Sequence, residues 1–437
     1  MEILAFSAPD RSQIKEQIKA LLSGRDTPDP AAIRETCRTS RARFSHRDAF
    51  RLLVSAESGR SMSEAVGKAL FLLENPPSDG SWQQNGVFFG TGRKKTGPAF
   101  LFPGQGSQYA GMGAEFFQLF PETLEIIEQA EQATGSSPPL CTAMFPPPVE
   151  GKKEKNAQEE QLRRTDLAQP ALGVVSLAML EALGSFSVLP EAVCGHSYGE
   201  LTALMAAGRI NRRDFLRLSA DRGKFMAQAG SGGDAGRMMA VKAPLENIPE
   251  LIAEYGLDII LANRNSPDQG VLSGPSADIE KMLVVCRENH IRAVILPVSA
   301  AFHSRLVETA ALPFQRSLES AAFYSSQIPV YSNTTGAPYP RDAESARSLL
   351  GRHLLHPVQF LDNIEAMFAG GIDTFIEVGP RSVLTGLVRS ILKERSHTAI
   401  AMDSSGGKQP AITDLAATLC QLAAAGHFVD LTQWPPQ

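Results

Sequence analysis

The sequence lacks several features that would place it in a class at once. It has five cysteines and no C-x-x-C pair, and these are Cys37, Cys141, Cys194, Cys286 and Cys420. This usage argues against a disulfide framework or a zinc site and fits a reducing compartment, so we expect the cytoplasm. No apolar run has the roughly 18–20 residues that span a bilayer, and residues 1–13 lack a secretory signal. The net charge of -5 gives no reason to expect nucleic-acid binding.

The chain has enough length and apolar sequence for more than one folding unit. Its 437 residues are 43% hydrophobic, and we expect two or three units. Residues 1–95 indicate a small α+β unit without recognisable chemistry, for which a structural role is expected. Its predicted strands cover residues 3–7, 50–55 and 87–89, and its predicted helices cover 11–22 and 62–73.

A different pattern begins at residue 98. Residues 99–102 resemble a buried strand that runs into the glycine-rich turn 103–108. The polar stretch 150–164 is predicted to be a solvated loop, whereas 170–183 predicts a buried helix and 192–195 the next strand. Residues 237–298 alternate as βαββαβ, which is typical of a ferredoxin-like insert. Further along, we expect a strand at 374–378 and a helix packed on the body within the last 30 residues.

Gly195-His-Ser-Tyr-Gly199 is a G-x-S-x-G element in the setting that gives this motif meaning. A valine-containing strand precedes it and a good helix-forming segment, 201–207, follows. Such a sharp turn needs its glycines and presents Ser197 at a helix N-terminus, where N–H groups stabilise negative charge. The sequence therefore predicts Ser197 as a nucleophile, against the simpler reading of an incidental serine in a turn.

A nucleophilic serine needs a base, and eight histidines are available. His196 adjoins Ser197, but neighbouring side chains at such a turn diverge, so we expect it to have a supporting role. His303 follows a predicted strand end, where catalytic loops of α/β proteins lie. Taken alone, His303 is also compatible with an ordinary loop or core histidine.

Six motifs appear in the same order as in malonyl-CoA:acyl-carrier-protein transacylases, and the chain resembles that family over about residues 98–397. They are FPGQGSQ (102–108), GHSYGE (195–200), SADRGKFM (219–226), NSPDQGVLSG (265–274), AFHS (301–304) and EVGPRSVLTGL (377–387). The resemblance is strongest to acyltransferase domains of type I polyketide synthases and related fatty-acid-type megasynthases. Residues 1–95 also resemble the linker between ketosynthase and acyltransferase in those synthases.

The resemblance implies roles for individual residues. Ser197 would be the acylated nucleophile and His303 its general base and acid, oriented by the main-chain carbonyl of His353 rather than by an acidic residue. The backbone N–H groups of Gln105 and Tyr198 would form the oxyanion hole, which suits a glycine turn directly after a strand.

The same resemblance implies substrate contacts. Arg222 would pair with a free acyl carboxylate, because a guanidinium binds carboxylates bidentately, although on its own it reads as a surface arginine. Phe302 matches the malonyl-selective pattern, its ring filling the space that a 2-methyl group needs, while Ala300 departs from the usual histidine there. His196 and Asn265 would be further substrate-binding residues.

Together these signals predict an α/β fold with an α/β-hydrolase-like core, a ferredoxin-like insert and an N-terminal α+β linker domain. The expected boundaries are 1–95 for the linker, 96–236 and 299–405 for the core, 237–298 for the insert and 406–437 for a C-terminal linker or helix. The implied reaction moves malonyl from coenzyme A through a serine ester to the phosphopantetheine thiol of an acyl carrier protein. No metal or tightly bound cofactor is expected, and the partners would include ketosynthase and other synthase domains.

Two rival interpretations stay open at this level. A hydrolase, such as an editing thioesterase, shares the same motifs and differs in whether the acyl-serine survives in water until a thiol arrives. A non-catalytic docking module is the other rival, and the intact Ser197, His303 and Arg222 argue against it.

Overall fold

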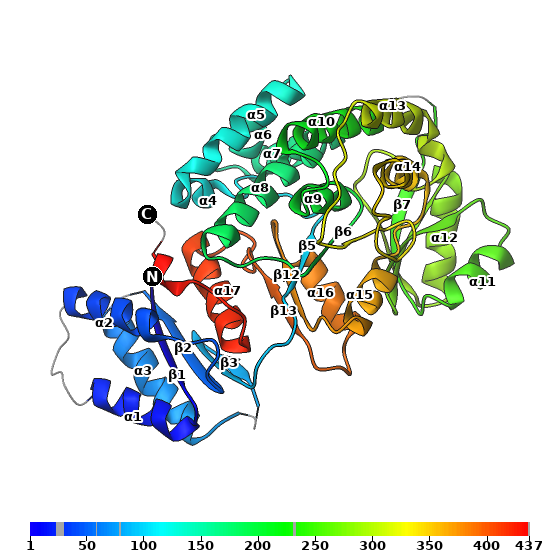
Figure 1. Ribbon diagram of the computed structural model, residues 1–437. Coiled ribbons are helices and arrows are strands. Elements are labelled where there is room, and N and C mark those ends of the chain that lie inside the picture. The colour runs from blue at the N-terminus through cyan, green and yellow to red at the C-terminus, as the bar shows by residue number, and fades with distance from the viewer. Residues whose placement is uncertain (23–29, 58, 78–79, 230–232, 436–437) are drawn as a thin grey trace.

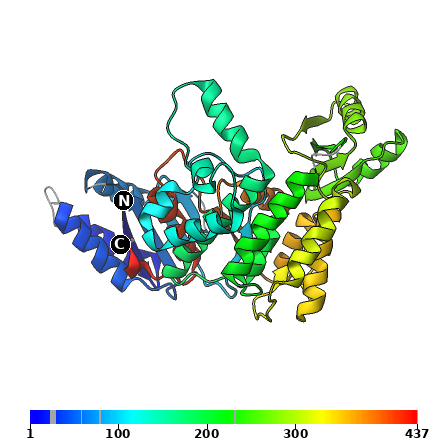
Figure 2. The same ribbon diagram turned by 90° about the horizontal axis from the view of Figure 1, so that it is seen from above.

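Three β-sheets organise the chain, as the computed structural model in Figures 1 and 2 shows. It describes residues 1–437 apart from 23–29, 58, 78–79, 230–232 and 436–437. A four-stranded sheet comes first in the chain, a five-stranded parallel sheet lies at the centre, and a second four-stranded sheet is inserted between two strands of the central one.

The N-terminal sheet is antiparallel, in the order β1-β2-β4-β3, and both of its faces are buried. Alternate residues of β1 face opposite sides: Leu4 and Phe6 face the helices α1 to α3, while Ile3 and Ala5 face the rest of the protein. The elements are β1 (Glu2–Ala8), α1 (Arg11–Leu22), α2 (Pro30–Arg43), β2 (Phe50–Ala56), α3 (Gly59–Glu74), β3 (Trp82–Gln84) and β4 (Val87–Thr91). The polar helix α2 was not expected from the sequence.

The second face of that sheet is covered by the C-terminal helix α17 (Ala411–Ala425), as Figure 1 shows where the red helix lies beside the blue strands. Two buried arginines hold this seam. Arg51 Nε donates to the carbonyl oxygen of Ala424 at 3.0 Å, and Arg41 Nη2 donates to that of Trp434 at 2.8 Å. A Cβ on Gly90 would lie 1.7 Å from the Ala424 oxygen, so the helix requires glycine there. The expected helix packing on the body is present.

The central sheet has the order β11-β6-β5-β12-β13, with every pairing parallel. Its inner strands are buried on both faces, as parallel sheets require: Phe100 and Phe102 point to one helical layer, Ala99 and Leu101 to the other. The strands are β5 (Ala99–Phe102), β6 (Ala192–Gly195), β11 (Val330–Tyr331), β12 (Thr374–Glu377) and β13 (Thr398–Ala401). Parallel order places the carboxyl ends of β5, β6 and β11 at one edge.

Helices cover both faces of the central sheet. They are α4 (Ala114–Leu119), α5 (Leu124–Thr134), α6 (Leu140–Met144), α7 (Lys152–Arg163), α8 (Thr165–Ser185), α9 (Gly199–Ala206), α10 (Arg212–Ala229), α13 (Glu308–Glu319), α14 (Ala343–Arg352), α15 (Phe360–Ala369) and α16 (Val383–Ile391). Within the described residues, α8 alone is long and apolar enough to cross a membrane, a length that the sequence analysis did not expect. Its apolar window is 83% buried inside the protein, which identifies a core helix.

The loop predicted over residues 150–164 is wrong, because most of that stretch forms α7. Its sequence KKEKNAQEEQLR consists mainly of good helix formers, and a high charge content does not prevent a helix when the surface is exposed. Only Leu162 of α7 is buried. Figure 2 shows α7 standing out from the body as a teal-green helix.

The inserted sheet has the strand order β10-β7-β9-β8 and is antiparallel throughout. A βαββαβ chain that pairs in this order is ferredoxin-like, and the expected insert is present. Its elements are β7 (Arg237–Lys242), α11 (Asn247–Glu254), β8 (Ile260–Ser266), β9 (Gln269–Gly274), α12 (Ser276–Glu288) and β10 (Arg292–Ile295). The two helices cover one face, and residues of the other face, such as Asn265 and Val271, line a cavity against the central sheet.

Candidate active site

Ser197 occupies the turn between β6 and α9, in the left-handed conformation with φ of 51°. Both glycines of the motif are sterically required. A Cβ on Gly195 would lie 1.9 Å from the carbonyl carbon of Gly199, and a Cβ on Gly199 would lie 1.9 Å from the Phe102 oxygen. The turn is therefore a strained strand-to-helix elbow that presents the serine at the N-terminus of α9.

His303 is the histidine that reaches Ser197. Its Nε2 lies 2.7 Å from Ser197 Oγ, and its Nδ1 lies 3.1 Å from the carbonyl oxygens of both His353 and His356. Because a carbonyl only accepts, Nδ1 carries the proton and the lone pair of Nε2 faces the serine hydroxyl. The predicted His353 carbonyl is in place, and the His356 carbonyl is a second acceptor that sequence reasoning missed.

Burial keeps this imidazole neutral. Desolvation, followed by the positive charge of Arg222, lowers the pKa of His303 to about 3. The ring is therefore a free base at neutral pH. His196, the rival histidine, points elsewhere: its Nε2 lies 2.8 Å from Asn265 Oδ1 on the ferredoxin-like insert, so two predicted residues pair with each other across the cavity.

A cavity of about 220 Å³ opens onto the serine, between the central sheet and the ferredoxin-like insert. Six of the nine predicted site residues line it, and these are Gln105, His196, Ser197, Asn265, Phe302 and His303. Tyr198, Arg222 and His353 lie behind that lining. Within the described ranges, no group of three or more His, Cys, Asp or Glu side chains is placed to hold a metal ion.

Two backbone amides are free to stabilise an oxyanion. Among the described residues, the amides of Gln105 and Tyr198 donate to no protein acceptor, whereas that of Ser197 donates to Asn333 Oδ1 at 2.7 Å. The Gln105 side chain is anchored away from the turn, where its Nε2 donates to the Arg163 oxygen at 3.2 Å. The family resemblance assigns an oxyanion hole to these two amides, and that role stays a prediction.

Arg222, on α10, is 1% exposed. Across the part of the chain that the structure describes, none of its three guanidinium nitrogens has a hydrogen-bond partner, and the Tyr198 ring lies 5.8 Å from the guanidinium carbon. Burial lowers the pKa of Arg222 to about 10, which leaves it charged at neutral pH. A buried cation without an acceptor fits an anionic group that arrives from outside.

Phe302 and His353 complete the set of predicted residues. Phe302 is 6% exposed and lines the cavity, and its carbonyl accepts a hydrogen bond from Ser273 Oγ at 2.8 Å. The His353 imidazole is buried beside His303, with the ring centroids 5.3 Å apart, and its Nε2 lies 3.9 Å from Glu200 Oε2.

Sequence reasoning missed a buried polar group behind the elbow. Asn333, beyond the end of β11, contacts both sides of the serine turn, and its own amide donates to Glu200 Oε2 at 3.1 Å. Tyr339 donates its hydroxyl to the other oxygen of Glu200. The sequence analysis predicts no strand at 330–331, so no sequence signal pointed to Asn333.

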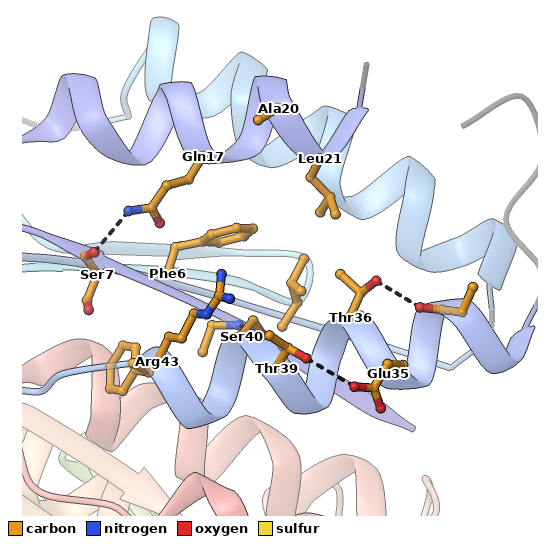
Figure 3. A pocket seen from close by; sticks show the side chains of 14 residues that line it. Phe6, Ser7, Gln17, Ala20, Leu21, Glu35, Thr36, Thr39, Ser40 and Arg43 are labelled. Atoms are coloured by element: carbon orange, nitrogen blue, oxygen red, sulfur yellow. Dashed lines mark hydrogen bonds between the residues drawn. The ribbon is translucent and has the colours of Figure 1, made fainter. Parts of the chain in front are cut away.

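A larger hollow lies in the N-terminal unit, far from this chemistry. Figure 3 shows it between α1 and α2, where Phe6 and Leu21 form part of its wall. Its volume is about 640 Å³. Gln17 Nε2 donates to the Ser7 carbonyl across one end at 3.3 Å. The described residues that line the hollow include neither histidine nor cysteine, so the candidate active site is the smaller cavity at Ser197.

The elbow, the serine–histidine pair and the two free amides define a serine acyltransferase or hydrolase with an α/β-hydrolase-like core. The comparison with known families distinguishes these classes. Residues 99–426 match the acyl transferase domain family, which covers most of the chain. The protein belongs to that family.

Individual relatives agree. The chain is 34% identical over 308 residues to the malonyl CoA-acyl carrier protein transacylase of Bacillus subtilis (strain 168), covering 69% of this chain and 93% of the relative. It is 30% identical over 449 residues to the polyketide synthase GfsA of Streptomyces halstedii, covering 98% of this chain but only 6% of that protein. The acyltransferase domain from the second module of the salinomycin polyketide synthase aligns with a TM-score of 0.74 at 28% identity, over 99% of this chain and 95% of that one.

Proposed function

We propose that the protein transfers a malonyl group from coenzyme A, through an ester on Ser197, to the phosphopantetheine thiol of an acyl carrier protein. The observation that carries this proposal is the 2.7 Å contact between Ser197 Oγ and His303 Nε2, in a cavity backed by the unpaired guanidinium of Arg222. Ser197 and His303 are the proposed catalytic pair, and the Bacillus subtilis relative reported above is named a malonyl CoA-acyl carrier protein transacylase.

In the first half-reaction, Ser197 Oγ attacks the thioester carbonyl while His303 Nε2 takes the hydroxyl proton. The oxyanion that forms accepts hydrogen bonds from the amides of Gln105 and Tyr198. The carbon–sulfur bond then breaks, the coenzyme A thiolate takes the proton from His303, and the malonyl ester remains on Ser197.

In the second half-reaction, His303 accepts the proton of the carrier thiol, and the thiol sulfur attacks the ester carbonyl. The same two amides bind the second oxyanion. When the carbon–oxygen bond breaks, His303 returns the proton to Ser197 Oγ, so the enzyme regains its starting state. The carbonyls of His353 and His356 keep the imidazole in one orientation throughout.

Substrate selection in this proposal depends on two side chains. Arg222 binds the free carboxylate of the malonyl group, because its guanidinium is buried, charged and unpaired. Phe302 occupies the place that a 2-methyl substituent needs, which favours malonyl over methylmalonyl. His196 and Asn265 hold each other at the cavity wall and contact the acyl thioester from that side.

We also propose that the chain works as part of a synthase assembly in the cytoplasm, with its carrier protein and ketosynthase as partners. In this view residues 1–95 are the ketosynthase-to-acyltransferase linker, 96–236 and 299–405 the catalytic core, 237–298 the ferredoxin-like insert and 406–437 a C-terminal linker. The near-complete alignment with a synthase acyltransferase domain supports this division.

Intact-protein mass spectrometry tests the proposal. Incubation with malonyl-CoA should add one malonyl mass, and this mass should leave the protein when a carrier protein with a free phosphopantetheine thiol is added. Ser197→Ala should show no adduct. An adduct that persists in Ser197→Ala contradicts the assignment of the nucleophile, and an adduct that water removes as fast as the carrier does identifies a hydrolase instead.

A further inference from the structure

Asn333 contacts the catalytic elbow on both sides of His196. Its Oδ1 accepts the Ser197 amide hydrogen at 2.7 Å, and its Nδ2 donates to the Gly195 carbonyl at 2.6 Å. The side chain is completely buried. The Asn333 carboxamide therefore joins the Gly195 carbonyl and the Ser197 amide in one hydrogen-bonded ring, which spans His196 at the turn from β6 into α9.

The sheet explains how residues so distant in sequence meet. β11 lies parallel to β6, with Tyr331 opposite Cys194, so the residues just beyond both strand ends emerge side by side. Gly195 is the last residue of β6, and Asn333 is the second residue after β11 ends at Tyr331. The contact with Ser197 joins residues 136 positions apart, and it depends on the parallel register of these two short strands.

The hydrogen bond to Asn333 fixes the direction of the Ser197 amide. An elbow serine at φ 51° is strained, and its amide has to be held by an acceptor if the strain is to persist. With the Ser197 amide committed to Asn333, the oxyanion is left to the amides of Gln105 and Tyr198. The orientation of Ser197 Oγ toward His303 depends on the same turn.

The group behind Asn333 fixes the asparagine in turn. Its backbone amide donates to Glu200 Oε2 at 3.1 Å, and its carbonyl accepts from the Gln359 amide at 2.8 Å. Glu200 and Tyr339 are buried, and a hydrogen bond joins them. The asparagine has no freedom to turn its carboxamide, so the donor and acceptor stay on their assigned sides of the elbow.

We propose that Asn333 is a positioning residue for Ser197, holding the elbow so that the hydroxyl meets His303 and the oxyanion meets two other amides. In the proposed function it sets the rate of malonyl loading without touching the substrate. Because Asn333 acts on the nucleophile, a reagent that reacts with Ser197 and carries no acyl group can test this role.

The first test measures how fast a fluorophosphonate labels Ser197, a reaction in which the oxygen–phosphorus bond forms and fluoride leaves. Asn333→Ala should lower the labelling rate about 100-fold, the size of loss expected from a misplacement of roughly 1 Å. The matched control is Asn363→Ala. Asn363 is equally buried and donates to Cys194 Sγ on the same strand at 3.4 Å, but it does not touch the elbow. This control should label at the wild-type rate.

A second variant gives a signature that a general loss of stability does not produce. In Asn333→Asp the protonated carboxyl group has the same donor and acceptor as the amide, whereas the ionised group faces the Gly195 carbonyl with two acceptors. Burial raises the pKa of such a carboxyl group. The ratio of variant to wild-type labelling should therefore rise severalfold as the pH falls from about 8 to about 5.

Dividing the labelling rate of the variant by that of the wild type removes the contribution of other groups that titrate near Asn333. Glu200, whose pKa burial raises to about 7, Tyr339 and His353 face this position, and Arg222 acts on Glu200 from α10. All four are present in both proteins, so the ratio removes their own titration, whereas the new carboxyl group and Glu200 titrate as a coupled pair. Malonyl-CoA KM should also stay unchanged in both Asn333 variants while kcat falls.

Two results would overturn the inference: equal labelling rates for Asn333→Ala and Asn363→Ala, or a ratio for Asn333→Asp that does not change with pH. The outcome is separate from that of the proposed function. A wild-type protein that reacts with the fluorophosphonate but not with malonyl-CoA refutes malonyl transfer and leaves the Asn333 comparison valid.

Discussion

Replacement of Arg222 by alanine is the perturbation that separates a transferase for dicarboxylic acyl groups from a general acyl-transfer enzyme. The guanidinium is 1% exposed, and in the described chain its three nitrogens have no acceptor. A malonyl carboxylate that entered without this partner would be desolvated and unpaired, which costs roughly 2–4 kcal/mol, or about 30- to 1,000-fold in loading rate. An acetyl group has no carboxylate to desolvate, so its loading should hold or improve.

The assay is the initial rate of Ser197 acylation by malonyl-CoA and by acetyl-CoA, measured for wild type, Arg222→Ala and Arg222→Lys. The lysine should rescue malonyl loading only partly, because an ammonium keeps the charge without the planar fork. Arg217→Ala is the matched control. Arg217 lies on the same helix but pairs with Asp214 and Asp221, and its removal should leave the preference for malonyl intact.

The Arg222 substitution also has an electrostatic readout. The positive charge of Arg222 contributes to the low pKa of His303, second to burial, so Arg222→Ala should raise that pKa. Titration of the His303 ring by NMR measures this shift. Equal losses of malonyl and acetyl loading in Arg222→Ala would refute the reasoning, since they would make Arg222 a structural residue and place malonyl recognition elsewhere.

Three further predictions follow from the same cavity. His303→Ala should slow malonyl loading by about 10²–10⁴-fold, measured as the rate of Ser197 acylation, without changing the melting temperature. If His303→Ala had almost no effect and His196→Ala lowered the rate, the base would be His196. In the wild type, His303 has a pKa of about 3 and is a free base above that pH. An NMR titration from neutral pH to about pH 5 should therefore show no protonation of this ring. A titration midpoint of His303 near the ordinary value of 6.5 would contradict its burial. Phe302→Ser should narrow the preference for malonyl- over methylmalonyl-CoA in competition loading, by up to the roughly 1–3 kcal/mol that one methyl group is worth, and equal loading of both by the unmodified protein would contradict the steric argument.

The features that could be predicted from the sequence are those with local signals. The elbow needs glycines at 195 and 199, a strand before them and a helix after them, and all of these lie within the 15 residues 192–206. The ferredoxin-like insert likewise follows from alternating strands and helices over 237–298. Family motifs then pointed to His303, whose distance of 2.7 Å from Ser197 only the fold establishes.

The features that the sequence could not provide depend on long-range packing. The pairing of Asn333 with Ser197 requires the register of β11 on β6, and nothing near either residue specifies it. The helix α7 was missed for a different reason, because charge content was given more weight than helix propensity. The buried helix predicted over 170–183 is present, but the full length of α8, Thr165–Ser185, was missed because polar residues of its first turn, Thr165 and Asp166, interrupt the apolar run.

The seam between α17 and the N-terminal sheet determines when the protein can finish folding during its synthesis. Ile3 and Ala5 leave the ribosome first, but the face they form stays open until residues 411–425 arrive to cover it. Arg51 and Arg41 gain their carbonyl acceptors only then. A graft of this unit into a synthase therefore needs both ends of the segment, since a junction cut before residue 411 would remove one carbonyl acceptor from each of two buried arginines and expose an apolar sheet face to water.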